Sequence, residues 1–501
     1  MQEKLQELKN RLQEVYDLEM AGALLSWDQQ TYMPAGGAEA RGRQLALLAQ
    51  LCQEKFTDPA VGRLLEELQP YAQSLPYDAD DAALVRVTQR AYDKEVKVPP
   101  ALVSELNIQY AASFQAWTEA RPANDFKKVI PYLEKTLELS RRLANCFPGY
   151  QHIADPLIDY GDYGMSAVSV QAVFAELRKS LVPIVQAITA QPPADDSCLR
   201  QVYPAAAQLD FGLGVIRQLG YDFNRGRQDL THHPFTTKFS IGDVRITTRV
   251  DEKNMGDALF STIHEAGHAM YEQGISMALE GTPLARGTSS GVHESQSRLW
   301  ENVVGRSRGF WNYFYPSLQA AFLPQLGNVP LETFYRAINK VEPSLIRTDA
   351  DEVNYNLHVM LRFDFELALL EGKLAVKDLP EAWAERYKSD LGITPPDDRM
   401  GCLQDVHWYA GTIGGMFQGY TLGNIMSGLW YQQALAAHPE IPSEMEQGRF
   451  DILHNWLKEN LYQHGRKFTA AELLQRVTGG PLRIEPYIQY LKTKYGELYQ
   501  I

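Results

Sequence analysis

LFSTIHEAGHAMY, residues 259–271, carries apolar side chains at helical spacing around the five residues from His264 to His268. Residues i and i+4 of a helix lie one above the other, so His264 and His268 can present two imidazole nitrogens to one metal ion. Glu265 lies one step round the helix and can reach a water molecule held at that place. Two imidazole ligands, an open position and a carboxylate base form the arrangement that a zinc hydrolase needs. Gly274 is the predicted end of this helix.

The same five residues also fit a surface helix that carries a pair of histidines by chance. The surrounding sequence favours burial instead, because Leu259, Ile263 and Met270 flank the motif, and a helix that is apolar nearly all round lies in a protein interior. Two buried histidines and a buried glutamate need partners, since an isolated buried polar group is costly. One metal ion provides a partner for all three, and we therefore expect a metal site here.

The composition is that of a large globular protein. The chain has 501 residues, of which 45% are hydrophobic and 22% are charged, which is ample for a core and for more than one lobe. The net charge of −14 argues against nucleic acid or an anionic membrane as a partner. The four cysteines are scattered, which favours free thiols in a reducing compartment. The N-terminus has no apolar signal core and no stretch approaches transmembrane length, so we expect a cytoplasmic protein.

Most of the chain has the period of α-helices. Apolar residues recur at spacings of three and four in three long stretches, residues 3–20, 168–190 and 351–370. Pro183 is predicted to kink or break the second stretch, and Gly372 to close the third. No low-complexity linker, internal repeat or charge block marks a boundary, so residues 1–501 are expected to form a single helical domain. An arrangement of two lobes around a cleft stays open at this point.

One segment alternates at period two instead. Residues 237–241 and 244–250 are predicted strands, and Gly242-Asp243 between them predicts a two-residue hairpin turn. The hairpin ends just before the predicted metal helix begins. An exposed strand in that place could pair its main chain with an extended peptide, and a small structural sheet is the equally weighted alternative.

The third metal ligand is expected on a helix downstream. Glu294 and Glu301 lie two helical turns apart on one face, and periodicity alone does not choose between them. Either carboxylate completes a His, His, Glu site with water in the fourth position. A ligand histidine usually donates its second nitrogen to a nearby carboxylate. In several zinc peptidases that acid lies four residues after the ligand glutamate, but here that position is Arg298, so the carboxylate must come from elsewhere.

Six short motifs follow one another along most of the chain. They are His-Pro-Phe at residues 233–235, Asp-x-Arg-x-Thr at 243–247, His-Glu-x-x-His at 264–268, His-Glu-Ser-Gln at 293–296, Ile-Arg-x-x-Ala-Asp at 346–351 and Gly-x-x-Gln-Asp-x-His-Trp at 401–408. Together they resemble the carboxypeptidase Taq family of metallocarboxypeptidases, and the chain departs from none of them. By this resemblance the fourth motif selects Glu294 over Glu301 as the third ligand.

The resemblance implies a mainly α fold, in which a large helical body contains a deep active-site cleft. The period-two segment adds a small β-hairpin or sheet beside the zinc helix. The resemblance also implies a homodimer that removes single C-terminal residues from peptides with broad specificity and acts poorly on C-terminal proline. One divalent metal ion per chain is expected. Two imidazoles and a carboxylate favour zinc, and we expect cobalt to substitute.

The residue types and the resemblance together assign the catalytic roles. Glu265 is the expected general base, which takes a proton from the attacking water and passes it to the leaving amine. The tetrahedral oxyanion needs a hydrogen-bond donor, and resemblance to related helical zinc peptidases makes His407 and Tyr420 the candidates. The alternative for each is a packed core residue. His233 is expected to line the substrate cleft.

Recognition of a free C-terminal carboxylate favours arginine, whose guanidinium matches a carboxylate in a two-pronged contact. Arg347 and Arg245 are the two arginines that fall in the family motifs. The alternative for Arg347 is a structural ion pair with Asp349, Asp351 or Glu352.

Three functions fit these observations. A zinc carboxypeptidase acting on peptides with a free C-terminus is favoured. A helical zinc endopeptidase or oligopeptidase shares the metal motif but needs no arginine clamp. A non-enzymatic helical protein with a vestigial metal site is disfavoured, because ligands, base and oxyanion donors are all present.

The histidines near the C-terminus, His438, His454 and His464, are expected to be ordinary surface residues.

Overall fold

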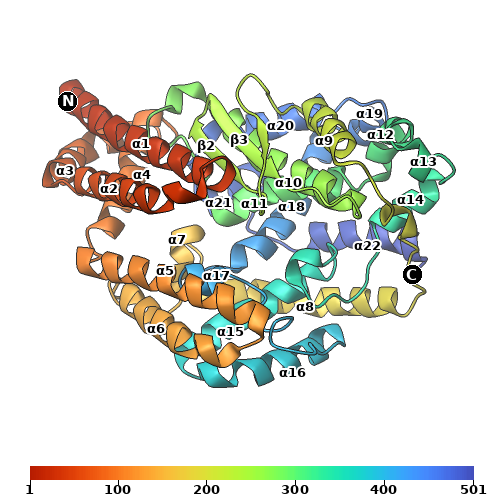
Figure 1. Ribbon diagram of the computed structural model, residues 1–501. Coiled ribbons are helices and arrows are strands. Elements are labelled where there is room, and N and C mark those ends of the chain that lie inside the picture. Colours follow the sequence, from red (N-terminus) through yellow and green to blue (C-terminus); the bar gives the residue numbers. More distant parts are fainter.

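The computed structural model describes residues 1–501, and most of them are helical (Figure 1). The helices before the sheet are α1 (Gln2–Thr31), α2 (Ala38–Phe56), α3 (Pro59–Ser74), α4 (Asp80–Glu95), α5 (Pro100–Ala123), α6 (Phe126–Ala144), α7 (Asp155–Gly161), α8 (Ala167–Thr189) and α9 (Ala205–Leu219). Those after it are α10 (Met255–Gly274), α11 (Ser290–Arg298), α12 (Arg308–Ala321), α13 (Leu323–Leu326), α14 (Leu331–Ile338), α15 (Tyr355–Glu371), α16 (Leu379–Leu391), α17 (His407–Ala410), α18 (Gln418–Ala437), α19 (Ile441–Met445), α20 (Asp451–Asn460), α21 (Ala470–Thr478) and α22 (Glu485–Tyr499). The expected mainly helical fold with a small sheet is confirmed. No helix combines the length and the apolar character that crossing a membrane requires.

Several helix ends follow the signals in the sequence. Helix α10 ends at Gly274, as predicted, and α15 ends before Gly372, which has a φ of 75° and forms the left-handed cap. Of the kink or break predicted at Pro183, the break is wrong, because α8 continues through this residue. Leu181, Ile184 and other apolar side chains beside the proline are buried, and their packing outweighs the loss of one backbone hydrogen bond.

The sheet has three short strands, β1 (Gln228–Leu230), β2 (Thr236–Ser240) and β3 (Asp243–Thr248), in the order β1-β3-β2. Strand β3 pairs parallel to β1 and antiparallel to β2, so β2 is an edge strand. The hairpin is confirmed, but its turn lies one residue earlier than predicted, at Ile241 and Gly242. Ser240 pairs with Asp243 across an irregular register, and the fully buried Ile241 side chain belongs to the core.

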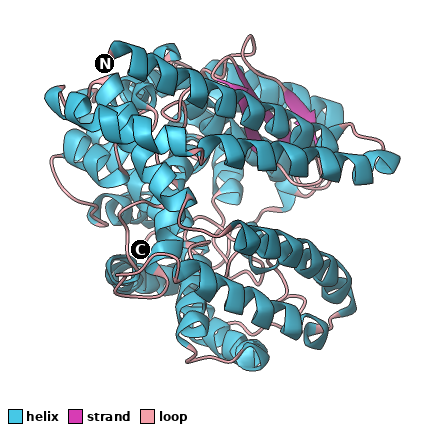
Figure 2. Ribbon diagram, turned by 90° about the vertical axis from the view of Figure 1, so that its left-hand side faces the viewer, coloured by secondary structure: helices cyan, strands magenta, loops and turns pink.

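The helices and the sheet surround one large cavity. In Figure 1, α5, α6, α15 and α16 lie in the lower part of the molecule, and α1, α9, α10 and the sheet lie in the upper part. Figure 2 shows the strands confined to one region and enclosed by helices. The main apolar core extends from α5 to α22. A smaller core joins α1, α3 and α4 to Ile241 and to the segment after α10.

Candidate active site

Helix α10 presents both histidines of the motif to the cavity. Their side chains are 19% and 17% exposed, whereas Ile263, Ala266 and Met270 on the other faces are fully buried. The expected burial of this helix is therefore confirmed. A buried helix of this kind is rigid, which fixes the spacing between His264 and His268 along its axis.

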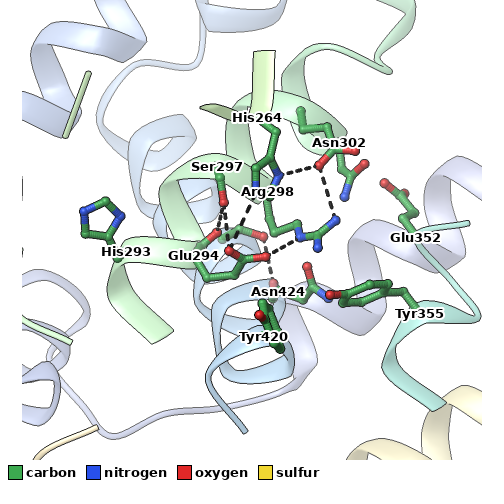
Figure 3. Close-up of polar contacts among 12 residues, drawn as sticks. His264, His293, Glu294, Ser297, Arg298, Asn302, Glu352, Tyr355, Tyr420 and Asn424 are labelled. Atoms are coloured by element: carbon green, nitrogen blue, oxygen red, sulfur yellow. Dashed lines mark hydrogen bonds and ion pairs between the residues drawn. The ribbon is translucent and has the colours of Figure 1, made fainter. Parts of the chain in front are cut away.

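Glu294 of α11 brings a carboxylate oxygen to the same point (Figure 3). Its Oε2 lies 3.8 Å from Nε2 of His264 and 3.4 Å from Nε2 of His268, and the three ligand atoms lie within 4.8 Å of one another. Ligand atoms about 2.1 Å from a tetrahedral ion are separated by about 3.4 Å. Both the donor types and their spacing therefore fit one divalent ion. We call His264, His268 and Glu294 the ligand cluster.

Both oxygens of the Glu294 carboxylate accept a hydrogen bond from the protein. Arg298 donates from Nε to Oε1 over 2.7 Å, and the Ser297 hydroxyl lies 3.2 Å from Oε2 (Figure 3). Burial by itself raises the pKa of Glu294, but Arg298 and the two imidazoles hold this pKa well below its usual range. The carboxylate is thus ionised and oriented before any ligand arrives.

Glu301 is the carboxylate that orients His264. Its Oε2 lies 2.8 Å from Nδ1 of His264, and Arg298 donates to the same oxygen over 3.2 Å. Residues Leu299–Val304 form a π-helical turn that continues α11, and such turns are frequent at functional sites. The sequence offered Glu301 only as a rival ligand. Glu301 and Glu294 are seven residues apart and so lie on one face. This spacing made both of them candidate ligands, and it also places Glu301 beside Glu294.

His268 is oriented by a chain of three polar groups. Its Nδ1 lies 2.6 Å from Nδ1 of His293, and Nε2 of His293 lies 2.8 Å from Glu272. The ammonium of Lys238 on strand β2 donates to the other oxygen of Glu272. With Nε2 of His268 turned to the ligand cluster, Nδ1–H of His268 donates to His293, and Nε2–H of His293 donates to Glu272. Sequence reasoning missed His293 in this role, although it lies in the His-Glu-Ser-Gln motif.

Two glycines allow α10, α11 and α18 to approach at the ligand cluster. A Cβ atom at Gly267 would lie 2.7 Å from Cα of Ser297 and 2.8 Å from the carbonyl oxygen of Gln296. A Cβ atom at Gly423 would lie 2.7 Å from Cβ of Glu294. Glycine at these two positions therefore sets how close Glu294 comes to the two histidines.

Glu265 lies on the cavity wall beside the ligand cluster. The hydroxyl of Thr236 on strand β2 lies 2.6 Å from Oε2 of Glu265 and 2.9 Å from its carbonyl oxygen. Glu265 forms no ion pair, and its only side-chain hydrogen bond is to Oε2. Its Oε1 is therefore available to a molecule in the cavity. Thr236 was not singled out by the sequence, and its hydroxyl fixes the rotamer of Glu265.

His407 and Tyr420 both line the cavity and contact each other. Nε2 of His407 lies 3.0 Å from the Tyr420 hydroxyl, and Nδ1 of His407 has no hydrogen-bond partner and is 3.8 Å from Asp405. Burial, assisted by Arg347, lowers the pKa of His407 to about 4, so its imidazole is neutral at pH 7. Burial also raises the pKa of Tyr420 well above its usual range. Both are therefore neutral hydrogen-bonding groups.

Arg347 forms an ion pair, but not with the acids that the sequence put forward. Its Nε and Nη2 donate to Asp405 over 3.0 and 2.8 Å, and its Nη1 donates to the Tyr355 hydroxyl over 2.8 Å. A guanidinium has five N–H groups, so two remain. Asp405 also accepts from the fully buried Arg362, which leaves one net positive charge for these three side chains. Tyr355 had no sequence signal, and it also packs under Arg298, 4.3 Å from the ring centre.

The two remaining candidate residues are placed differently. His233 lines the cavity, and its Nδ1 lies 2.9 Å from the Pro234 carbonyl oxygen. Arg245 does not line the cavity. It is ion-paired with Asp243 over 2.8 Å and stacks on Trp27. This placement does not support a contact between Arg245 and the substrate.

The cavity that joins these groups has a volume of about 2030 Å³. Its wall contains the ligand cluster, Glu265, residues 236–238 of strand β2, Arg347 and the His407–Tyr420 pair. Ligand pockets are commonly about 300–1,000 Å³, so this one is large enough for a peptide.

Known proteins of one family match this chain over nearly its full length, both in sequence and in structure. A sequence profile of the carboxypeptidase Taq (M32) metallopeptidases matches residues 7–495. Thermostable carboxypeptidase 1 of Thermus thermophilus is 41% identical over 490 residues, which cover 95% of each protein. Carboxypeptidase 1 of Bacillus subtilis is 37% identical over 480 residues, covering 96% of this chain and 95% of that protein. The crystal structure of an M32 carboxypeptidase from Deinococcus radiodurans R1 superposes with a TM-score of 0.97 at 50% identity, covering 99% of this chain and all of that one.

Proposed function

Because the chain belongs to the carboxypeptidase Taq (M32) family of metallopeptidases and is a metallocarboxypeptidase, we propose that it removes single C-terminal residues with one ion held by His264, His268 and Glu294. The observation that carries the proposal is the meeting of these three ligand atoms with Glu265 and Arg347 in one cavity. Two imidazoles and a carboxylate favour zinc, and cobalt is expected to substitute.

Glu265 is the proposed general base. When bound, the divalent ion would supply Lewis-acid activation of water and of the scissile carbonyl. Oε1 of Glu265 takes a proton from the attacking water and then delivers it to the leaving amine. Thr236 holds Oε2, so that one oxygen stays directed at the substrate. Proton transfer of this kind contributes about 10²–10⁴-fold to the rate.

Two hydrogen-bond donors also line the cavity. We propose that His407 and Tyr420 donate to the oxygen that becomes negative in the transition state. Their mutual contact of 3.0 Å supports this, because each holds the other in place while the substrate is absent. The unpaired edge of β2 is proposed to align the peptide by main-chain pairing, since residues Thr236 to Lys238 lie on the cavity wall.

Arg347 is the proposed clamp for the C-terminal carboxylate. Its two remaining N–H groups and the net positive charge that it shares with Asp405 and Arg362 support this role. His233 is proposed to line the substrate path near His407, whose pKa it also helps to lower.

The experiment that tests this proposal is Glu265→Gln, with Glu385→Gln on the exposed face of α16 as the matched control. We expect Glu265→Gln to retain its ion by elemental analysis and to lose at least about 10²-fold in kcat on an N-blocked peptide. The control keeps both properties. Substantial activity of Glu265→Gln at any pH would show that another group is the base.

Further properties are proposed from the resemblance. They are a homodimer and broad specificity with poor release of C-terminal proline. Residues 1–501 are proposed to act as one catalytic domain, because no linker, repeat or charge block in the sequence marks a boundary. A reducing compartment, the cytoplasm, is proposed because all four cysteines are unpaired. Sedimentation and a panel of peptides that differ in the last residue test the first two.

A further inference from the structure

Two arginines that line the cavity on the side of Gly287 and Glu272 have no carboxylate partner. The side chain of Arg466 donates only from Nε to the carbonyl oxygen of Gly287, over 3.4 Å, and its terminal nitrogens bond to no protein atom. The side chain of Arg90 forms no hydrogen bond or ion pair and lies over the ring of Tyr163, 3.8 Å from its centre. Both residues line the cavity. Their guanidinium groups are therefore available to a molecule inside it.

The other cations of this wall are already neutralised. They pair as Arg286 with Glu19, Lys94 with Asp159 and Lys238 with Glu272. Glu95 is the one carboxylate here without an ion pair, and burial together with nearby Glu19 raises its pKa. The two unpaired arginines outnumber this one carboxylate, so this side of the cavity has an excess of positive charge.

The environment of Arg466 shows the same excess. Burial and the neighbouring Arg286 and Arg90 lower its pKa to about 10, so it remains charged at neutral pH. An enclosed cation without a counter-charge is costly, because the protein replaces only part of its hydration. An anionic group bound between Arg466 and Arg90 removes that cost. Arginine also suits a carboxylate, because its fork makes two parallel hydrogen bonds.

Arg466 and Arg347 lie towards opposite ends of the ligand cluster along α10. His264, nearer the N-terminus of α10, contacts Glu301, and Arg298 links Glu301 to Tyr355 and so to Arg347. At the other end, His268 contacts His293, and His293 contacts Glu272. The charge of Glu272 acts on Arg466 directly. A peptide whose C-terminus is at Arg347 therefore extends its preceding residues toward Arg466.

We propose that Arg466 and Arg90 form a subsite for an acidic side chain of the substrate, N-terminal to the scissile bond. The enzyme then favours peptides with Asp or Glu upstream of the residue that it removes. This inference rests on the proposed function, because it takes the direction of the peptide from the carboxylate clamp.

The test uses acetylated alanine hexapeptides ending in phenylalanine, with Glu or Gln placed two, three or four residues before the scissile bond. We expect one of these positions to give a Glu/Gln ratio of kcat/KM of about 10. The ratio falls to about 1 in Arg466→Gln and to an intermediate value in Arg466→Lys. Arg476→Gln, on α21 and outside the cavity, is the matched control and keeps the ratio of the unaltered protein.

The outcomes separate the two proposals. If no peptide loses its C-terminal residue, the proposed function itself fails. If the peptides are cleaved but the ratio stays near 1 at every position, or survives in Arg466→Gln, the subsite is overturned. Inorganic sulfate is the probe for a free-anion site. Suppression of the Glu preference by sulfate supports the subsite, whereas a sulfate-dependent rise in Tm without any Glu preference overturns it.

Discussion

Oε2 of Glu301 lies 2.8 Å from Nδ1 of His264, which leaves Nε2 of the same ring directed at the Glu294 carboxylate. Two glutamates seven residues apart therefore have different tasks. Glu294 belongs to the ligand cluster, whereas Glu301 fixes the orientation of the His264 ring, which belongs to the same cluster. Arg298 lies between them and donates to both, so the three side chains of α11 and its π-helical continuation form one unit.

The first prediction separates these two glutamates. Glu294→Ala should lose the ion, because one of three protein ligands is gone. Glu301→Gln should still bind one ion at saturation but with about 10–100-fold weaker affinity, the usual cost of losing a partner that orients a ligand. Competition with a chromophoric chelator measures both. If Glu301→Gln lost the ion and Glu294→Ala kept it, the two assignments would have to be exchanged.

The second prediction concerns His293. Removing its ring in His293→Ala leaves Nδ1 of His268 without an acceptor, so metal affinity should fall about 10–100-fold. His438→Ala is the control, since the side chain of His438 is 41% exposed and its one ion pair is with Glu440 of its own segment. Chelator competition gives the affinities. An unchanged affinity in His293→Ala would mean that the chain to Glu272 does not orient the ligand.

The third prediction concerns the close approach at Gly267. Gly267→Ala places a methyl group against the backbone of α11, which cannot yield as a flexible side chain would. We expect a loss of about 1–3 kcal/mol in stability and weaker metal binding, because α11 carries Glu294. Gly256→Ala, on the same helix, meets no atom closer than 3.5 Å and should cost little. Equal effects of the two substitutions would remove the argument that backbone contact sets the ligand spacing.

The fourth prediction concerns pH and His454. Burial lowers the pKa of His454 to about 4, so the unfolded chain takes up this proton near pH 6.5 and the folded chain only near pH 4. Protons therefore favour unfolding, and stability present above pH 6.5 is lost as the pH falls toward 4. Between pH 7 and 4.5, His454→Asn should lose about 2 kcal/mol less than the unaltered protein. Urea unfolding at the two values, with His438→Asn as control, would show parallel losses if His454 were already charged.

Motifs in the sequence predicted more of the site than helical periodicity did. Periodicity placed Glu294 and Glu301 on one face and could not choose between them, whereas the His-Glu-Ser-Gln motif could. The contacts of His293 with His268 and of Glu301 with His264 depend on how α11 lies against α10. No pattern within one helix contains that relation.

Long-range packing accounts for the expectations that the structure corrects. Arg347 pairs with Asp405, 58 residues away, instead of the acids next to it. His454 was expected at the surface because its neighbours in sequence are polar, yet its ring packs against Trp300 and Tyr462. The hairpin turn lies one residue before its predicted position, because Ile241 is buried against the N-terminal helices. In each case a distant segment decided the environment of a residue.

The clamp at Arg347 is the central claim, and it is tested by comparing an N-blocked peptide with its C-terminally amidated twin, read by mass spectrometry. The account predicts stepwise loss of single residues from the free acid and little change in the amide, since a buried carboxylate needs a paired cation. Arg347→Ala should lower kcat/KM on the acid by about 10²-fold or more while the ion stays bound, and Arg347→Lys should recover only part. Equal cleavage of both peptides at internal bonds, or full activity of Arg347→Ala on the acid, would contradict it.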